Sequence, residues 1–428
     1  MQLNKYQLIN GIVYYDRILR KMNVGINNGI ITYLGDEILD NYDLIDCRNR
    51  LITLGFIDTH VHFRSPGYSY KEDLVTGSRA ALKGGYMHVC TMPNTKPCLD
   101  NYKDLKYYLR QANIKSDIFI HSFSAITLNQ EGRDLVDIEN ISTLGICGYS
   151  DDGKGLQDGS MMKQVLIETG EFNHLVSAHC EDETTYQDGQ GCIGVGKTAS
   201  EHNLKTISNA CESNMIDRDL KVISHIHGIY NYHYHVCHIS TMQSLKLIEA
   251  AKAKGYNVSC EVTPHHLISD ESEIDINNTN YKMNPPLRSR NDVDYLVEGL
   301  RNGHIDIIAT DHAPHTKEDK DVPFDEAPFG IIGLEMAFSL LNTYLIKSGK
   351  VPLVKILECL IDNPSNIFNI EHRLAVGEHA FLNIIDLDCD VMYTENDLAS
   401  KSCNTFYLNR ALKGKVIMNI VKRKQFYW

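Results

Sequence analysis

The middle of this chain alternates between apolar runs of β character and segments with the spacing of an amphipathic helix. Eight apolar runs can be followed over about 320 residues, with helix-period segments such as 101–111 and 241–254 between them. This alternation predicts the α/β class and a (β/α)8 TIM-like barrel with insertions. An open doubly wound sheet would usually carry a glycine-rich phosphate turn after its first strand, and the sequence has none there. The runs are Leu51–His62, Met87–Met92, Ile118–Phe123, Gly145–Ser150, Leu175–His179, His235–His238, Asn257–Val262 and Ile305–Asp311.

The two ends of the chain differ from this middle. Short β-type runs at the start are separated by Asn-Gly pairs, which suit tight hairpins, and the last fifty residues again alternate like strands. We therefore predict a small composite β-sandwich domain from residues 1–53 and 375–428, and a catalytic barrel domain from residues 54–374. Two unrelated edge hairpins are the alternative interpretation of the ends.

Charge and cysteine usage exclude several classes of protein. The formal net charge is −13 and no strongly basic run occurs, which argues against nucleic acid as a partner. No stretch of about 18 apolar residues is present, so no membrane span is expected. The 12 cysteines are scattered without a CxxC pair, a pattern typical of reduced thiols. The first residues do not resemble a signal peptide. We expect a cytoplasmic protein.

Metal-ligand residue types stand where the predicted strands end. In a parallel barrel these ends meet at one rim, where barrel enzymes keep their catalytic groups. Core packing does not explain such side chains on five different strands, so we predict a metal centre. The residues concerned are His60, His62, Asp152, His179, His238 and Asp311.

The spacing of His60 and His62 places both imidazoles on one face of a strand, with Cα atoms about 7 Å apart. Both rings can then reach one Zn²⁺ ion. Four histidines and two carboxylates exceed the needs of one catalytic zinc, which favours two metals sharing a carboxylate. Asp311 would be both a ligand and a proton shuttle, although an aspartate before a turn can also be a helix N-cap.

Three polar residues near these strand ends are candidates for binding substrate. Arg64 follows the histidine pair, and its planar guanidinium suits a carboxylate. Asn94 follows the second strand, and Asn284 lies in a loop stiffened by two prolines. An exposed salt bridge for Arg64 and simple turn chemistry for Asn284 are the alternatives. Spacing alone leaves His265 and His266 undecided.

At this point the sequence resembles the amidohydrolase superfamily and, within it, the class I dihydroorotases. The matching stretches follow one another in order over nearly the whole chain, which makes the resemblance specific. They are the segments 55–64, 92–95, 150–153, 178–182, 237–240, 260–266, 282–288, 309–315 and 327–330.

The resemblance implies a set of metal ligands. His60, His62 and Asp311 would hold one metal, and His179 and His238 the second. Many relatives bridge the two metals with a carbamylated lysine. Here Asp152 takes the matching position, and the choice of Asp152 over Asp151 rests only on its place before Gly153. The implied cofactor is Zn²⁺, one or two ions per chain, with two favoured.

The resemblance also implies substrate contacts. Arg64, Asn94 and His315 would hold the side carboxylate of the substrate. Asn284 and the backbone near Phe329 and Gly330 would hydrogen-bond the ring amide. The charge-rich segment 315–326 would act as a lid.

The implied activity is that of a dihydroorotase: reversible cyclisation of N-carbamoyl-L-aspartate to L-dihydroorotate plus water in de novo pyrimidine (UMP) synthesis, by metal-activated hydroxide. Another cyclic amidase, a hydantoinase or an allantoinase, is the alternative enzyme. A non-catalytic dihydroorotase-like scaffold is the alternative outside catalysis. The sequence leaves open whether the chain forms a homodimer or associates with aspartate transcarbamoylase, as some family members do.

Overall fold

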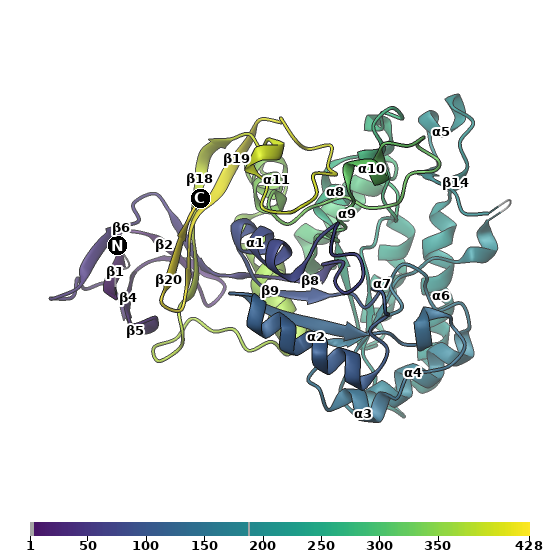
Figure 1. Cartoon of the computed structure of the whole chain (residues 1–428), viewed down its shortest axis with the longest axis horizontal. Helices are drawn as coiled ribbons and strands as arrows, with labels where there is room; N and C mark the ends of the chain where they lie inside the picture. Colours follow the sequence, from purple (N-terminus) through teal and green to yellow (C-terminus); the bar gives the residue numbers. More distant parts are fainter. Residues whose placement is uncertain (1–3, 187–188) are drawn as a thin grey trace.

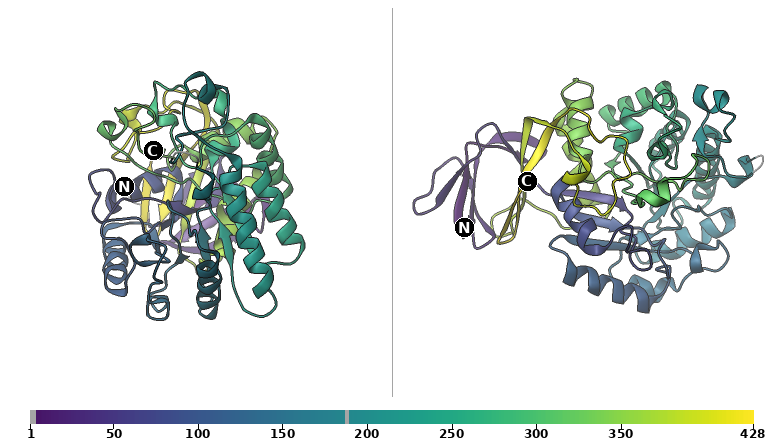
Figure 2. Two further views of the ribbon diagram at one scale, coloured as in Figure 1. Left: turned by 90° about the vertical axis from the view of Figure 1, so that its right-hand side faces the viewer. Right: turned by 45° about the horizontal axis from the view of Figure 1, so that its top comes forward.

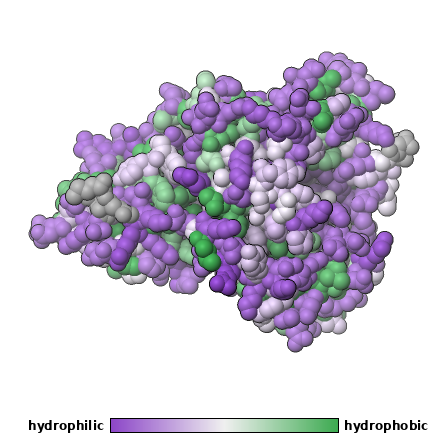
Figure 3. Space-filling model, in the orientation of Figure 1, coloured by the Kyte–Doolittle hydropathy of each residue, from purple (hydrophilic) through white to green (hydrophobic). Residues whose placement is uncertain are grey.

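The computed structural model describes residues 4–186 and 189–428. Figure 1 shows an elongated molecule with a small all-β part at one end and a larger α/β part at the other. Both termini lie in the small β part, and the two further views in Figure 2 agree. The face seen in Figure 3 is largely hydrophilic, with scattered apolar patches. None of the helices in the described ranges has the length and apolar character needed to cross a bilayer.

The larger part is built on a parallel sheet of eight strands in the order β17-β16-β15-β12-β11-β10-β9-β8. A parallel bridge between Val61 and His312 joins its two ends, and the amide of His62 donates to the carbonyl of His312 at 2.8 Å. The sheet therefore closes into a barrel, which confirms the predicted α/β barrel class. Its strands are β8 (Phe56–Val61), β9 (Tyr86–Thr91), β10 (Phe119–Ser124), β11 (Gly148–Tyr149), β12 (Val176–Ala178), β15 (Tyr234–Val236), β16 (Val258–Val262) and β17 (Ile307–Ile308).

Helices lie around this barrel, and local sequence fixes where they begin and end. Helix α1 begins after Asp73, whose carboxylate accepts from the amides of Val75 and Thr76, and it ends at Gly85 in the left-handed conformation (φ 93°). The helices are α1 (Leu74–Gly84), α2 (Tyr102–Lys115), α3 (Ile138–Ser142), α4 (Gly159–Glu171), α5 (Lys197–Glu201), α6 (Asn209–Ile226), α7 (Met242–Ala253), α8 (Pro264–Ile268), α9 (Arg290–Asn302), α10 (Lys317–Lys320), α11 (Ala337–Leu341), α12 (Leu353–Leu357) and α13 (Asn363–Ile367).

Shorter elements complete the barrel part. Single-turn π-helical segments directly follow α11 and α12, over Asn342–Ile346 and Glu358–Asp362. Strands β13 (Ile193–Gly194) and β14 (Thr206–Ile207) form a small two-stranded sheet in the connection after β12. Short 3₁₀ turns cover Leu128–Gln130, Glu183–Thr185, Glu271–Glu273, Thr279–Tyr281 and Glu395–Asp397.

The small β part contains two sheets. A four-stranded sheet, in the order β5-β4-β1-β6, comes from the N-terminal segment alone. A six-stranded sheet, in the order β20-β19-β18-β7-β2-β3, combines strands from both ends of the chain, because β18 pairs with β7. The strands are β1 (Lys5–Ile9), β2 (Ile12–Tyr15), β3 (Ile18–Lys21), β4 (Asn23–Asn27), β5 (Ile30–Gly35), β6 (Asp43–Asp46), β7 (Leu51–Leu54), β18 (Phe381–Val391), β19 (Leu412–Val421) and β20 (Lys424–Tyr427).

The predicted first strand of the barrel, Leu51–His62, is two strands. At Gly55 the chain passes from β7 in the six-stranded sheet to β8 in the barrel, and the amide of Gly55 donates to the carbonyl of Phe381 at 2.9 Å. A Cβ at this position would lie 2.4 Å from the side chain of Met87, so only glycine fits the crossing. The continuous run of apolar residues concealed this change of sheet.

Candidate metal centre and active site

The structure brings all six predicted metal ligands together at the carboxyl ends of the barrel strands. His60 is the last residue but one of β8, His62 directly follows that strand, His179 directly follows β12, and His238 comes two residues after β15. Asp152 and Asp311 each stand three residues after their strands, β11 and β17. This is the end of a parallel barrel from which catalytic side chains normally project.

The backbone is held in an unusual conformation at this rim. Arg64, His238 and Asp311 all have positive φ angles, of 53°, 27° and 48°. Such conformations cost non-glycine residues on the order of 1–3 kcal/mol and persist only where the surrounding structure enforces them. Their concentration among the predicted site residues marks this rim as a site built for function.

One half of the cluster is formed by His60, His62 and Asp311. The Oδ1 atom of Asp311 lies 3.0 Å from Nε2 of His62 and 3.6 Å from Nε2 of His60. The structure does not support the alternative that Asp311 is a helix cap, because the next helix, α10, is capped by Thr316. Three donor atoms of three side chains therefore face a common point.

The other half contains His179 and His238, and Asp152 lies between the halves. Oδ1 of Asp152 is 3.5 Å from Nδ1 of His179, 3.5 Å from Nε2 of His238 and 3.4 Å from Nε2 of His60. Its Oδ2 atom is 3.5 Å from Nε2 of His62. Asp152 thus reaches all four histidines from a bridging position.

Asp151 points elsewhere. Its carboxylate accepts hydrogen bonds from the amides of Ile126 and Thr127, at 2.8 and 3.2 Å, and from the Thr127 hydroxyl. These bonds fix the loop that follows β10. Of the two adjacent aspartates, only Asp152 faces the histidines.

The donor set fits a divalent metal. Nε2 of His60 and Oδ1 of Asp152, which lie 3.4 Å apart, are buried atoms without a hydrogen-bond partner among the described residues. Buried polar atoms are normally satisfied, so unpaired lone pairs that converge at one place indicate a ligand. In two of the three groups of donor atoms found within 4.8 Å of one another in the described residues, all members are predicted ligands: His60, Asp152 and His238, and His60, His62 and Asp311. Imidazole nitrogens with carboxylate oxygens are ligands that zinc prefers.

The electrostatics of the cluster also favour a cation. Burial opposes ionisation of Asp311, but the bond to His62 and the charge of His60 lower the pKa of its carboxyl group to about 2. Burial likewise opposes protonation of His60, and Asp152 and Glu261 outweigh it, so the pKa of its imidazole is raised well above the ordinary value. The carboxylates therefore keep their negative charge and attract positive charge to this point.

Partners on the outer nitrogens orient three of the four histidines. Nδ1 of His62 lies 2.9 Å from Oδ1 of Asn94, and Nε2 of His179 lies 2.9 Å from Oε2 of Glu181. Nδ1 of His60 lies 2.7 Å from Oε1 of Glu261. Such partners fix which nitrogen carries the proton and leave the other free for a metal.

Sequence reasoning missed Glu181 and Glu261. Both lie in stretches that matched the family, but each was given no role. The available signal was Glu261 itself, a lone charge inside the strand β16, whose residues are all buried. A buried carboxylate needs a partner, and that requirement could have pointed to a histidine.

The predicted substrate-binding residues surround a cavity of about 180 Å3 next to the cluster. Its lining residues include Arg64, Asn94, Asn284, Phe329 and Gly330, together with Asp311 and Asp152. Gln190, which was not predicted, also lines this cavity. The amide of Asn284 donates to Oε2 of Glu181 at 2.9 Å, so its orientation is linked to the metal cluster.

His315 lies behind Arg64, where it contacts the guanidinium at 3.3 Å. Its other ring nitrogen is 3.2 Å from Nζ of Lys71, which was not predicted to contribute. Burial, followed by the charges of Arg64 and Lys71, lowers the pKa of His315 to about 2. The ring is therefore neutral, and this edge of the cavity carries positive charge suited to a carboxylate.

The neighbouring loops are tied to the same site. In the predicted lid segment, Nζ of Lys320 is buried and donates to the carbonyls of Thr279, Lys282 and Pro328, at 3.1, 3.1 and 2.8 Å. His266 lies away from the cluster and bonds Thr263 and Pro285. It braces the loop that carries Asn284.

Comparison with known sequences gives one consistent family. The family described as "Dihydro-orotase-like" matches residues 49–244. The dihydroorotase of Brevibacillus brevis is 40% identical over 413 residues, covering 96% of each chain. The dihydroorotase of Staphylococcus aureus is 39% identical over 416 residues, covering 96% of this chain and 97% of the relative.

Solved structures support the fold. The dihydropyrimidinase of Brevibacillus agri superposes with a TM-score of 0.84 at 20% identity and covers 98% of this chain and 94% of its own. The L-hydantoinase of Arthrobacter aurescens gives a TM-score of 0.85 at 20% identity, with coverage of 99% and 96%. Taken with the full-length sequence similarity to the curated relatives, these findings show that the chain belongs to the dihydroorotase family of the amidohydrolase superfamily.

Proposed function

We propose that this chain is a dihydroorotase, which interconverts N-carbamoyl-L-aspartate and L-dihydroorotate, with loss or gain of water, in de novo pyrimidine synthesis. The observation that carries the proposal is that Arg64 and five of the six predicted metal ligands, all but His60, line one cavity of about 180 Å3. A reacting amide and a substrate carboxylate can thus be held side by side. Relatives named dihydroorotase over 96% of the chain support the same activity.

The roles of the residues follow from their positions. A bound divalent metal would polarise the ring carbonyl and lower the pKa of a water molecule. Asp311 lines the cavity, and its carboxylate would accept the proton of the attacking water and deliver it to the ring nitrogen as the ring C–N bond breaks. In the cyclisation direction the same carboxylate would take a proton from the carbamoyl nitrogen and give it to the oxygen that leaves as water.

Other residues that line the cavity would orient the substrate. Arg64 would hold the side carboxylate in a charge-assisted pair, with Asn94 beside it and His315 steadying the guanidinium from behind. Asn284 and the backbone near Phe329 and Gly330 would hydrogen-bond the ring amide. A neutral cyclic substrate, such as the hydantoin ring, would leave Arg64 buried against no anion.

The finer parts of the proposal are zinc as the metal, two ions per chain with Asp152 between them, a lid formed by 315–326 and a cytoplasmic location. A composite sandwich domain, 1–53 plus 375–428, beside a barrel domain, 54–374, belongs to the same proposal. A homodimer and an association with aspartate transcarbamoylase stay predictions for which gel filtration and co-purification are the measurements.

The test is a matched set of assays on the purified chain. Activity is measured with N-carbamoyl-L-aspartate and L-dihydroorotate, and with hydantoin and allantoin, before chelation, after it and after zinc is restored. We expect turnover of the first pair only, lost on chelation and regained with zinc. Faster turnover of hydantoin or allantoin would replace the proposal with the alternative amidase. Bound metal without turnover of any substrate would favour the scaffold.

A further inference from the structure

Glu261 reaches across the interior of the barrel to the metal cluster. It lies on β16, whereas His60 lies on β8, and β17 separates the two strands in the sheet. Its Oε1 atom is 2.7 Å from Nδ1 of His60. Its Oε2 atom accepts from the Thr59 hydroxyl at 2.6 Å and lies 3.2 Å from Nε2 of His235. Glu261 is completely buried, and three polar groups surround its carboxylate.

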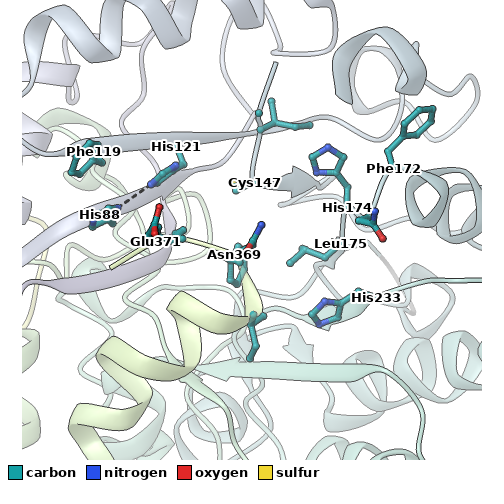
Figure 4. A pocket seen from close by; sticks show the side chains of 16 residues that line it. His88, Phe119, His121, Cys147, Phe172, His174, Leu175, His233, Asn369 and Glu371 are labelled. Carbon is teal, nitrogen blue, oxygen red and sulfur yellow. Dashed lines mark hydrogen bonds between the residues drawn. The ribbon is translucent and has the colours of Figure 1, made fainter. Parts of the chain in front are cut away.

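The contacts continue beyond Glu261 along the barrel axis. Nδ1 of His235 is 2.8 Å from the Ser259 hydroxyl, which is also 2.8 Å from Nε2 of His233. The His235 ring is held edge-on against Phe368, with centroids 5.4 Å apart. His233 lines a cavity of about 510 Å3 at the opposite end of the barrel, where Figure 4 shows it beside Leu175. We call Glu261, His235, Ser259 and His233 the core chain.

The direction of these hydrogen bonds follows from the carboxylate. An ionised carboxylate can only accept, so the ring nitrogens that face Glu261 must carry protons. Nδ1 of His60 is therefore protonated. Nε2, which faces Asp152 and Asp311 at 3.4 and 3.6 Å, is then the nitrogen through which His60 would hold a metal.

The other histidines of the cluster lack such a long support. The outer nitrogen of His62 meets the neutral amide of Asn94. The outer nitrogen of His238, Nδ1, has no hydrogen-bond partner among the residues that the structure describes. The outer nitrogen of His179 contacts Glu181, and Glu181 in turn accepts a hydrogen bond from Gln190, a residue at the rim. Only His60, among the described cluster residues, is supported from the interior of the barrel through a chain of contacts.

We propose that Glu261 is a positioning residue, which presents Nε2 of His60 to the metal, and that the core chain anchors Glu261 from the opposite end of the barrel. The inference rests on the proposed metal centre, although not on the identity of the substrate. A carboxylate partner also raises the basicity of a ligating imidazole. Metal affinity should therefore depend on residues that never touch the metal.

The first experiment measures metal binding in three variants of the full chain. Glu261→Gln retains the shape of the side chain but removes its charge and one acceptor. Ser259→Ala removes the hydroxyl that holds His235. Glu335→Gln is the control, because Glu335 is a similarly buried carboxylate that accepts instead from the amides of Ala399 and Ser400, at 2.7 and 3.0 Å. Each variant is loaded with Co²⁺ or Zn²⁺ and transferred to a chelator.

We expect Glu261→Gln to bind metal about 10- to 100-fold more weakly and to change the visible absorption of bound Co²⁺. Ser259→Ala should shift both readouts in the same direction by a few-fold, and Glu335→Gln should match the wild type. Equal metal affinity in Glu261→Gln and wild type would overturn the proposal. A loss in Glu335→Gln as large as that in Glu261→Gln would also overturn it, because any buried carboxylate would then suffice.

A second measurement does not use Glu261→Gln, so it does not depend on the stability of that variant. Nitrogen-15 NMR of ring-labelled histidine in the wild-type zinc protein reports which nitrogen of His60 carries the proton, and a His60→Asn sample assigns the resonance. We expect protonated Nδ1 and metal-bound Nε2. The reverse assignment would contradict the proposal. Neither measurement uses turnover, so a chain that binds metal as expected but does not act on L-dihydroorotate would refute the proposed function alone.

Discussion

Histidines cluster at both ends of the barrel, but their pKa values are shifted in opposite directions at the two ends. At the carboxyl ends of the strands, burial opposes protonation of His179, but Asp152 and Glu181 raise its pKa to about 10. At the opposite end, His88 and His121 lie 3.1 Å apart beside Phe119 (Figure 4). There burial lowers the pKa of His121 to about 4.

The two ends differ in the residues that surround the histidines, not in the number of histidines. His88, His121, His174 and His233 line the cavity of about 510 Å3, yet none of the donor groups within 4.8 Å in the described residues combines them. The smaller cavity at the other end has two buried carboxylates among its histidines. Buried carboxylates that stay ionised make one end a cation site, whereas the carboxylate that lines the cavity at the other end, that of Glu371, is exposed.

The largest expected effect comes from removing the central carboxylate. Asp152→Asn should lose bound metal and reduce kcat by at least about a thousandfold, because all four histidines face this side chain. Metal analysis and steady-state assays measure both effects. Asp151→Asn is the matched control: it should keep its metal and lower only the melting temperature, since Asp151 bonds the loop after β10. The reverse result would show that Asp151, and not Asp152, is the central carboxylate of the metal centre.

A smaller but still large effect is expected at the proposed proton carrier. Asp311→Asn should lower kcat by about 10²–10⁴-fold with little change in fold, because the amide cannot accept the proton of water. Circular dichroism and steady-state kinetics check the two parts. Turnover at the wild-type rate would remove Asp311 from this role.

The next prediction concerns the positive edge of the cavity. Arg64→Met should raise KM for N-carbamoyl-L-aspartate by about 10- to 100-fold, as expected for losing a charge-assisted bond worth 1.5–3 kcal/mol. Metal content should be unchanged. The exposed Arg79→Met serves as control and should leave KM as it is. An unchanged KM in Arg64→Met would show that the carboxylate binds elsewhere.

The smallest effect is expected at the opposite end, on stability alone. The folded pKa of His121, about 4, lies below the ordinary 6.5, so as pH falls below 6.5 the unfolded chain takes up the proton first and stability is lost down to about pH 4. Between pH 7.5 and 5 this costs the wild type about 2 kcal/mol. His121→Asn lacks that loss and should keep its activity.

Urea unfolding at the two pH values measures this effect. The neighbouring titratable groups, His88, Cys147 and Glu371, are present in both proteins, and because His88 contacts His121 at 3.1 Å the difference between the proteins reports this pair of histidines. His202→Asn, at an exposed histidine, should behave like the wild type. Equal pH dependence in wild type and His121→Asn would show that this end of the barrel does not keep its histidines neutral.

Much of the fold and of the site could be predicted because it depends on order along the chain. Alternating strands and helices imply a barrel, and residues at the ends of parallel strands must meet. The residues His60, His179 and Asp311, far apart in sequence, illustrate this. The crossing at Gly55 could not be predicted, because strands in different sheets join without a break in the apolar run.

The contacts that hold the site residues in place could not be predicted from the sequence either. Asp151 and Asp152 are adjacent and chemically identical, and only the direction of the chain after β11 decides which one faces the histidines. Glu261 contacts His60 across the interior, and Ser259 contacts His235 on the neighbouring strand, at sequence separations that no local pattern encodes. Lys71 lies near His315 only because the loops after β8 and β17 fold together.

The most direct test of the central claim is the anomalous scattering of zinc in crystals of the purified chain. The account predicts density between His60, His179 and Asp311, with ligand distances of about 2.0–2.2 Å. An active, metal-free protein, or zinc bound only among the histidines at the opposite end of the barrel, would contradict it.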